Sequence, residues 1–142
     1  MRALLDVNIL VALWDRDHVH HERARGWWNS NHQHGWASCP LTQGGFLRLV
    51  SNQLYPRSLS VARAIGELQI LLSVSGHEFW PDDVSIVDSI VFDHRHILGR
   101  NQITDFYLLA IAVKRGGRLV TLDHKITKTA VRGATPDHLV AL

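Results

Sequence analysis

The sequence predicts an α/β fold: a doubly wound parallel sheet with helices on both faces. Short apolar segments of strand length alternate with longer segments whose apolar residues recur at helical spacing. An aspartate ends the strand-like segment 2–6, and another directly follows the segment 118–122. In parallel sheets, ligands bind at the carboxyl ends of the strands, where these two aspartates would lie. At 142 residues, with 46% apolar and 20% charged residues, the chain is expected to form one domain spanning 1–142.

The composition favours a reducing environment and leaves nucleic-acid binding open. Fifteen Lys and Arg residues against thirteen Asp and Glu residues give a formal net charge of +2, which permits nucleic-acid binding without requiring it. A single cysteine, Cys39, excludes an internal disulfide. No apolar run has membrane-spanning length, and Asp6 and Asn8 interrupt the N-terminal apolar segment, which makes it a poor signal peptide. We therefore expect a cytoplasmic protein with no membrane partner.

The first third of the chain predicts two strands and two helices. Residues 2–6 form the first strand, and a short apolar helix follows over 7–14. A polar break precedes a second helix over 18–30, and a turn rich in Asn, His and Gly ends it. The second strand covers 35–39 and stops at Pro40.

The middle of the chain predicts a pair of helices. Thr42 is a candidate N-cap for a helix that runs through Asn52. A Tyr-Pro-Arg-Ser break follows, and apolar residues then recur at helical spacing over 60–74. Together the two helices predict an αα-hairpin.

The last part predicts two further helices and three strands. A brief strand covers 77–80, and the Pro and Asp residues of 81–83 are typical of a helix start. The clearest helix begins at position 104 or 105 and runs through Lys114, and Gly116 and Gly117 stop it. A buried strand covers 118–122, and a last strand is expected within 138–142.

Three carboxylates occupy equivalent places in this arrangement. Asp6 and Asp123 each follow a predicted strand, and Asp105 lies in the first turn of a helix. Right-handed crossovers bring the carboxyl ends of parallel strands to one edge, where these side chains would meet. Hard divalent cations such as Mg²⁺ or Mn²⁺ prefer such oxygen ligands, and a bound ion activates water toward a phosphate. The alternative is that all three are helix caps or turn residues.

Four motifs in order resemble the PIN-domain ribonucleases, most closely the VapC-type toxins of bacterial toxin–antitoxin pairs. The resemblance extends from position 4 to about 125. The motifs are Leu4-Leu5-Asp6-Val7-Asn8, Pro40-Leu41-Thr42-Gln43-Gly44-Gly45-Phe46-Leu47-Arg48, Thr104-Asp105-Phe106-Tyr107-Leu108-Leu109-Ala110 and Leu119-Val120-Thr121-Leu122-Asp123.

The resemblance implies an activity and partners. It implies Mg²⁺- or Mn²⁺-dependent hydrolysis of RNA phosphodiesters, with Asp6, Asp105 and Asp123 as metal ligands. It also implies a cognate antitoxin, a small DNA-binding protein that occupies the site, and a homodimer.

One residue departs from the family pattern. Gln43 stands where the family carries a glutamate on the helix after the second strand. Glutamine keeps a carbonyl oxygen that can ligate a metal or hold a water, but it lacks the negative charge and cannot act as a base. We therefore expect lower metal affinity and reduced activity in this form.

Further residues are candidates for supporting roles. Asn8 either orients Asp6 or a metal-bound water, or is simply a helix-start residue, and Thr104 either hydrogen-bonds the site or caps its helix. Basic residues that would form a phosphate-binding rim, or alternatively a solvated surface, are Arg48, Lys125 and Lys128.

Two other functions compete with the nuclease. A catalytically inactive PIN-like binding module would retain the fold and a partner while lacking chemistry because of Gln43. A haloacid-dehalogenase-like phosphohydrolase would use Asp6 as a covalent nucleophile, but that family has a second Asp two residues on, where this chain has Asn8. A dinucleotide-binding fold lacks support because no G-x-G-x-x-G follows a strand.

Overall fold

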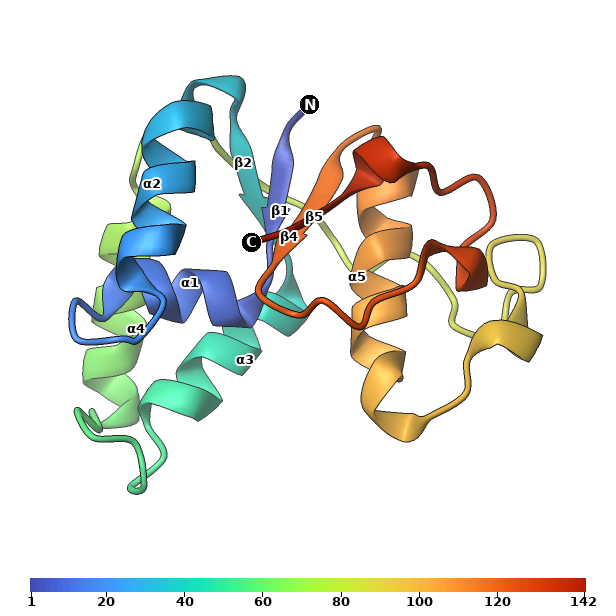
Figure 1. The fold of residues 1–142 in the computed structure, drawn as a ribbon. Coiled ribbons are helices and arrows are strands. Elements are labelled where there is room, and N and C mark those ends of the chain that lie inside the picture. The colour runs from blue at the N-terminus through green and yellow to red at the C-terminus, as the bar shows by residue number, and fades with distance from the viewer.

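The computed structural model describes all 142 residues and contains one sheet of five parallel strands (Figure 1). The strand order across the sheet is β3-β2-β1-β4-β5, and each neighbouring pair runs parallel. The predicted parallel sheet is confirmed. The strands are β1 (Ala3–Leu5), β2 (Trp36–Ser38), β3 (His77–Phe79), β4 (Arg118–Thr121) and β5 (Leu139–Ala141).

Helices cover both faces of the sheet, as the doubly wound prediction requires. Four of them pack on one face and the fifth packs on the other (Figure 1). The third and fourth helices contact each other and form the predicted αα-hairpin. No helix is long and apolar enough to cross a membrane. The helices are α1 (Val7–Trp14), α2 (His21–Asn31), α3 (Pro40–Val50), α4 (Val61–Leu72) and α5 (Ile103–Lys114).

The alternation of side chains along β1 divides the core into two layers. Leu4 belongs to the apolar cluster on the side of α5, together with Phe106. Leu5 points the other way and belongs to the cluster that contains Ile9 of α1 and Phe46 of α3. All five side chains are fully buried, so β1 is the centre of both layers.

The starts of α3 and α2 differ most from the sequence prediction. Helix α3 begins at Pro40, not at Thr42, because proline is favoured at the first helical position and Cys39 takes the cap position. The hydroxyl of Thr42 instead accepts a hydrogen bond from the Cys39 amide at 3.0 Å. Helix α2 begins at His21, three residues later than predicted, because His18 Nδ1 accepts the His20 amide and holds a turn.

The prediction of a helix that starts at residues 81–83 is wrong. The chain from Pro81 to Val91 is irregular, and its side chains form other contacts. Asp83 pairs with Lys114 at 3.1 Å and Arg115 at 2.8 Å, at the end of α5. The many β-branched residues of this segment also disfavour a helix. The segment therefore crosses from β3 toward α5 without regular structure.

A second ion-pair cluster fixes the same irregular segment. Asp93 accepts two hydrogen bonds from the Arg95 guanidinium, at 2.9 and 2.7 Å, and also approaches His96 at 3.4 Å. The hydrogen bonds and positive charge of the Arg95 guanidinium hold the pKa of the Asp93 carboxyl well below its usual range. Phe92 bridges to Val131 and ties the segment to the chain after β4.

The order in which strands are added to the sheet reverses between β1 and β4, although both strands run parallel. The chain adds β2 and then β3 on one side of β1, and returns to place β4 and then β5 on the other side. In open α/β sheets, ligands bind outside the carboxyl ends of the strands at such a reversal. The loops after β1 and β4 are therefore the expected place for a site.

The start of α1 lies close against α3. A Cβ added at Gly45 would clash with Cγ2 of Val7, the first residue of α1. Only glycine at position 45 lets the two helices approach this closely, so the residue fixes the spacing of α3 from the end of β1.

We expect the Gly45→Ala substitution to lower the free energy of unfolding by about 1–2 kcal/mol, because α1 and α3 must separate. Gly66 is the matched control: it lies inside α4, and an added Cβ there meets nothing within 4 Å. Gly66→Ala should stabilise the protein by about 0.5–1 kcal/mol. Urea unfolding of the three proteins measures both effects, and equal stability of the two variants would contradict the packing argument.

Candidate carboxylate site

Asp6 lies at the reversal point and is held in place by three hydrogen bonds. It is the N-cap of α1, and its Oδ1 accepts the Val7 amide at 2.6 Å. Its Oδ2 accepts Asn8 Nδ2 at 2.8 Å and Thr121 Oγ1 at 2.7 Å. A carboxylate has about four acceptor positions, so about one remains free. Asp6 is only 7% exposed, and this burial raises its pKa above the ordinary value.

Asn8 and Thr121 join the ends of β1 and β4 around Asp6. Asn8 Nδ2 also reaches Thr121 Oγ1 at 3.1 Å, and Asn8 Oδ1 accepts the Leu122 amide at 3.1 Å. Thr121 Oγ1 in turn accepts the Asp123 amide at 3.0 Å. Asn8 thus orients Asp6, which is one of the two roles considered from the sequence, and the same network sets the direction of the chain into Asp123.

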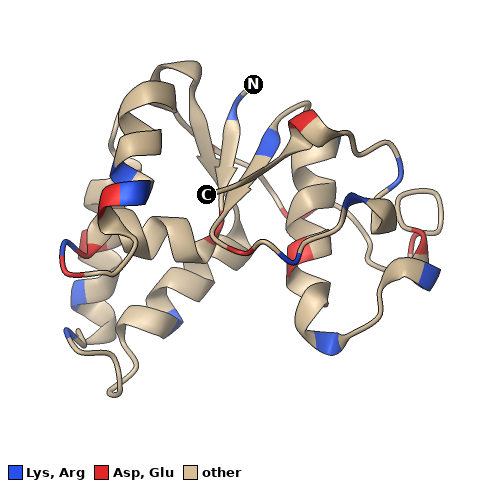
Figure 2. Ribbon diagram, in the orientation of Figure 1, with Lys and Arg blue, Asp and Glu red and all other residues tan.

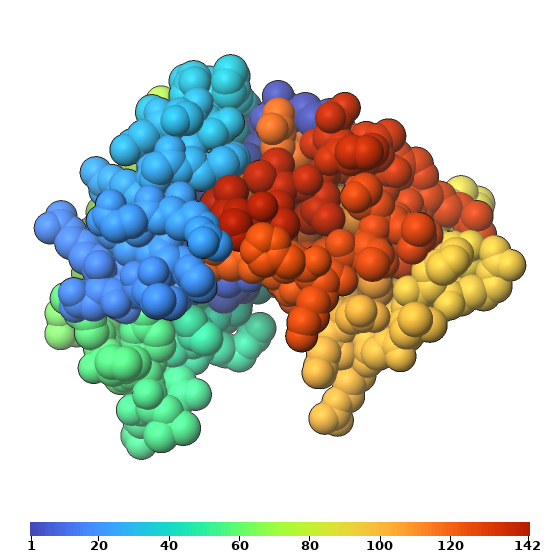
Figure 3. Space-filling view, in the orientation of Figure 1, coloured from blue at the N-terminus to red at the C-terminus, as the bar shows by residue number.

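Asp105 and Asp123 line one pocket beside this network. The pocket has a volume of about 380 Å³, and Gln102 and Lys125 also line it. Asp123 Oδ1 accepts the Lys125 amide at 2.7 Å, whereas the Asp105 side chain has no hydrogen-bond partner in the protein. Acidic ribbon segments at the start of α1, after β4 and in α5 face one another (Figure 2). In the same view, Figure 3 shows a notch below them, between α3 and α5.

The three carboxylates act on one another electrostatically. Burial and the negative charges of Asp6 and Asp123 raise the pKa of Asp105 to about 6. Asp123 contributes in the same direction to the raised pKa of Asp6. The site therefore carries negative charge that no cationic side chain neutralises by a salt bridge.

The donor chemistry of this site fits a hard divalent cation. Carboxylate oxygens are the preferred ligands of Mg²⁺ and Mn²⁺, and their mutual repulsion is what a dication would relieve. Gln102 Oε1 is a second indication: it is buried, it has no hydrogen-bond partner, and its residue lines the pocket with Asp105 and Asp123. As the side chains lie, no three acidic, His or Cys groups are close enough together to hold an ion. A bound cation thus requires Asp105 and Asp123, both partly exposed, to turn inward.

Gln43 lies in the first turns of α3, at the same edge of the sheet. Its Nε2 donates a hydrogen bond to Ser38 Oγ at 3.0 Å, and Ser38 is the last residue of β2. Ser38 Oγ is also 2.8 Å from Nε2 of His77 in β3. Gln43 does not line the pocket of Asp105 and Asp123, and its role at the site stays a prediction.

The predicted supporting and basic residues have different surroundings. Thr104 is exposed, makes no side-chain hydrogen bond, and lines a separate pocket with Leu41. It is the second residue of α5 and not its cap. Lys125 lines the carboxylate pocket, whereas Arg48 is exposed on α3 and Lys128 lies farther along the chain after β4. Neither lysine nor Arg48 has an ion-pair partner, and their phosphate-binding role stays a prediction.

Sequence reasoning missed residues that shape the site. Thr121 was noted within a motif but given no role, because a threonine in a strand fits the general preference of β-branched residues for sheets. The i, i+3 spacing of Gln102 and Asp105 would have placed both on one side of a helix start. Ser38 and His77 gave no signal, since they are 39 residues apart in the chain.

Comparison with known proteins identifies the family. A model described as the PIN domain matches residues 3–132 of the chain. The chain belongs to the PIN-domain family. It is 54% identical over 142 residues to ribonuclease VapC44 of Mycobacterium tuberculosis, a match that covers 100% of both chains. It is also 46% identical to ribonuclease VapC38 of that organism over 99% of each chain, and 40% identical to its VapC39 over 94% of this chain and 96% of the relative. The resemblance to VapC-type PIN proteins is therefore confirmed.

Two solved structures confirm the fold. A VapC20 structure from M. tuberculosis, described as a Sarcin-Ricin loop cleaving toxin, matches with a TM-score of 0.61 and 15% identity over 87% of this chain and 91% of that one. The VapBC2 structure from Rickettsia felis, bound to a DNA fragment from their promoter, matches with a TM-score of 0.64 and 16% identity over 99% and 97%. At these identities the likeness shows a shared PIN-like α/β fold.

The raised pKa of Asp105 predicts a pH-dependent stability for the metal-free protein. The folded pKa of about 6 lies above the ordinary value of 3.8, so the unfolded state ionises first and stability falls as pH rises between these values. Above about pH 6 the Asp105 carboxyl is ionised in both states, and the whole loss of folding stability remains. Asp105→Asn should therefore stabilise the protein at pH 7.5 by on the order of 1 kcal/mol, a figure reduced for partial solvent exposure, and change little at pH 4.

Thermal unfolding in a chelating buffer at both pH values measures this difference. Asp137→Asn is the control because Asp137 is exposed and lies away from the pocket. A stabilisation by Asp105→Asn of the same size at pH 4 and pH 7.5 would show that charge repulsion is not the cause.

Proposed function

We propose that the chain is a VapC-type RNA endonuclease that depends on Mg²⁺ or Mn²⁺ and acts as the toxin of a toxin–antitoxin pair. The observation that carries the proposal is the group of three mutually repelling carboxylates, Asp6, Asp105 and Asp123, at the reversal point of the sheet. The ribonuclease names of relatives that match the full length of the chain support the same activity.

Each carboxylate has a distinct part in this proposal. Asp6 is the fixed ligand, because its hydrogen bonds to Val7, Asn8 and Thr121 leave it one acceptor position and one orientation. Asp105 and Asp123 line the neighbouring pocket and, after turning inward, would complete the oxygen ligands. A bound Mg²⁺ or Mn²⁺ would lower the pKa of water and neutralise charge on the phosphate under attack. Lys125 lines the same pocket and would contact an RNA phosphate.

An antitoxin is the proposed protein partner. The uncompensated negative charge of the site favours a partner that inserts an Arg or Lys toward the carboxylates. The structural match to a VapBC pair from R. felis supports a partner of this kind. We also propose a homodimer, since symmetric pairs are the commonest oligomers.

Two alternatives have different support. An inactive binding module would share all of the geometry above and differ only in lacking cleavage, so an assay separates the two. A phosphohydrolase with Asp6 as nucleophile has less support, because both Asp6 oxygens accept hydrogen bonds and the residue is 7% exposed. A nucleophilic oxygen needs to be accessible to its substrate.

Cleavage of a fluorescent single-stranded oligoribonucleotide pool tests the nuclease. We expect cleavage in Mn²⁺, none after chelation, and a loss of about 100-fold or more in Asp6→Asn, because one fixed charge of the site is removed. Asp137→Asn is the surface control and should cleave normally. Absence of cleavage of every RNA in the pool, with Mn²⁺ binding intact, would favour the inactive binding module.

The Gln43→Glu substitution tests the proposed role of position 43. A fourth carboxylate should raise Mn²⁺ affinity and RNA cleavage, while lowering the metal-free thermal stability at neutral pH through like-charge repulsion. Added Mn²⁺ should reverse the order of stability. Gln69→Glu is the matched control, since Gln69 is exposed on α4. Equal RNA cleavage and equal Mn²⁺-induced shifts in thermal stability in the unsubstituted protein and in Gln43→Glu would show that position 43 has no role at the site.

A further inference from the structure

Three side chains from three elements form one hydrogen-bonded chain beside the carboxylate site. Gln43 Nε2 in α3 donates to Ser38 Oγ at the end of β2, at 3.0 Å. Ser38 Oγ lies 2.8 Å from His77 Nε2 in β3. No part of the proposed nuclease mechanism uses Ser38 or His77. These hydrogen bonds connect His77 on the edge strand β3 to Gln43, the residue that departs from the family pattern.

The burial of Ser38 sets the direction of this chain. Ser38 is fully buried, so its hydroxyl proton must go to a protein acceptor and not to water. The Gln43 amide nitrogen is a donor and cannot accept that proton. The remaining partner is His77 Nε2, which must then carry no proton. The direction is therefore from Gln43 to Ser38 to His77.

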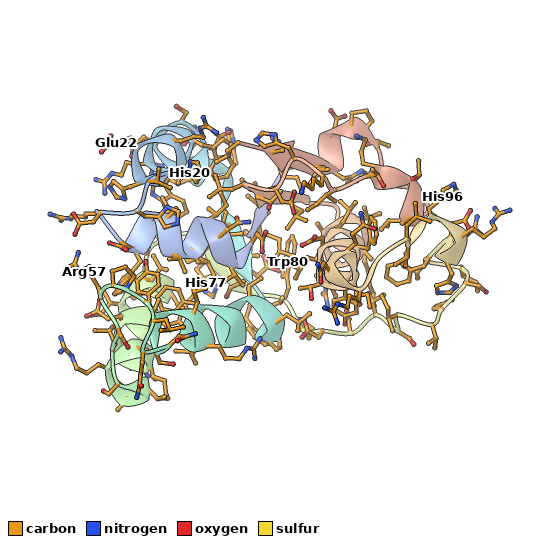
Figure 4. All side chains as sticks on the ribbon, turned by 60° about the horizontal axis from the view of Figure 1, so that its bottom comes forward. His20, Glu22, Arg57, His77, Trp80 and His96 are labelled. Carbon is orange, nitrogen blue, oxygen red and sulfur yellow. The ribbon has the colours of Figure 1, made fainter.

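The surroundings of His77 are compatible with a neutral ring. Burial lowers the pKa of His77, and the Arg2 guanidinium lowers it further, while Glu78 opposes them. Arg2 and Glu78 are paired with each other at 2.8 Å, and the Trp36 ring lies 4.6 Å from the His77 ring. Figure 4 labels His77, which comes from the edge strand β3. A neutral ring with a bare Nε2 is the acceptor that Ser38 needs.

The two ends of the Gln43 amide have different surroundings. Its nitrogen is engaged by Ser38, and its carbonyl oxygen makes no hydrogen bond within the protein and is not buried. Position 43 lies two residues before Gly45, which touches the start of α1 just after Asp6. The free oxygen is therefore a neutral, hard acceptor in the part of α3 that packs next to the carboxylate site.

We propose that His77 is a positioning residue: through Ser38 it holds the Gln43 amide with its carbonyl oxygen free for the carboxylate site. When residue 43 is a carboxylate, the donor and acceptor roles along the hydrogen bonds from residue 43 to Ser38 to His77 reverse. With glutamate at 43, the Ser38 hydroxyl donates to the carboxylate, and His77 donates its Nε2 proton to Ser38. The same Ser38 and His77 thus serve either side chain. The part of this inference that concerns metal binding rests on the proposed function, whereas the reversal does not.

The protonation of His77 Nε2 tests the reversal without metal or RNA. Ring nitrogen chemical shifts from ¹⁵N NMR distinguish a protonated Nε2 from a bare one. At pH 8 in a chelating buffer, we expect a bare Nε2 in the Gln43 protein and a protonated Nε2 in Gln43→Glu. His32, exposed and bonded through Nδ1 to the Trp28 carbonyl, is the internal control and should not change. The same tautomer of His77 in both proteins would overturn the inference.

A double-mutant cycle tests the positioning role. His77→Phe removes the acceptor for Ser38 and should weaken Mn²⁺ binding, followed by thermal shift, by about 10-fold. His77→Gln supplies a carbonyl oxygen and should restore binding. In a Gln43→Ala background, His77→Phe should change Mn²⁺ affinity by less than about 2-fold, because the residue through which it acts is gone. His32→Phe is the surface control.

The outcomes separate this inference from the proposed function. A 10-fold loss that persists in the Gln43→Ala background, or that His77→Gln does not restore, would show a general structural effect and overturn the positioning role. Absence of Mn²⁺ binding to the unsubstituted protein would remove the proposed metal dependence and the positioning role with it. The reversal of the His77 tautomer would be expected even then.

Discussion

The hydrogen bond from Thr121 to Asp6 is the interaction on which the rest of the site depends. It joins the ends of β1 and β4, the two parallel strands between which the order of strand addition reverses. The bond is buried and has a length of 2.7 Å. A buried carboxylate is costly unless donors compensate its charge, and Thr121, Asn8 and the Val7 amide provide that compensation. The same threonine accepts the Asp123 amide, so one hydroxyl both stabilises the first carboxylate and directs the chain to the next.

The sequence contained enough to predict the sheet and the helices around it, because each strand or helix depends on a local apolar pattern. Helix α1 begins and ends where predicted, and the αα-hairpin forms. The segment after Trp80 could not be predicted in the same way. Its Pro and Asp residues are typical of a helix start, but Asp83 pairs with basic residues more than 30 positions away. Such long-range partners are not visible in a local pattern.

The site was predictable only in part for the same reason. The carboxylates were found because acids after strands and at helix starts are conspicuous in a sequence. The neutral residues around them were not, since Thr121, Gln102 and Ser38 have ordinary structural uses in a strand or helix start. Their roles depend on burial and on partners distant in the chain: Ser38 is fully buried, and Gln102 Oε1 is buried without a partner.

The two walls of the carboxylate site respond differently to ionic strength. Asp6 lies on a wall made by β1 and α1. Buried apolar side chains hold this wall together, and their packing involves no charges for salt to screen. Asp105 lies near the start of α5, and the irregular segment is paired to the other end of that helix through Asp83 with Lys114 and Arg115, both partly exposed. Partly exposed ion pairs of this kind weaken as the ionic strength rises. We therefore expect the irregular segment to loosen from α5 first as salt is added, while the wall that holds Asp6 keeps its shape.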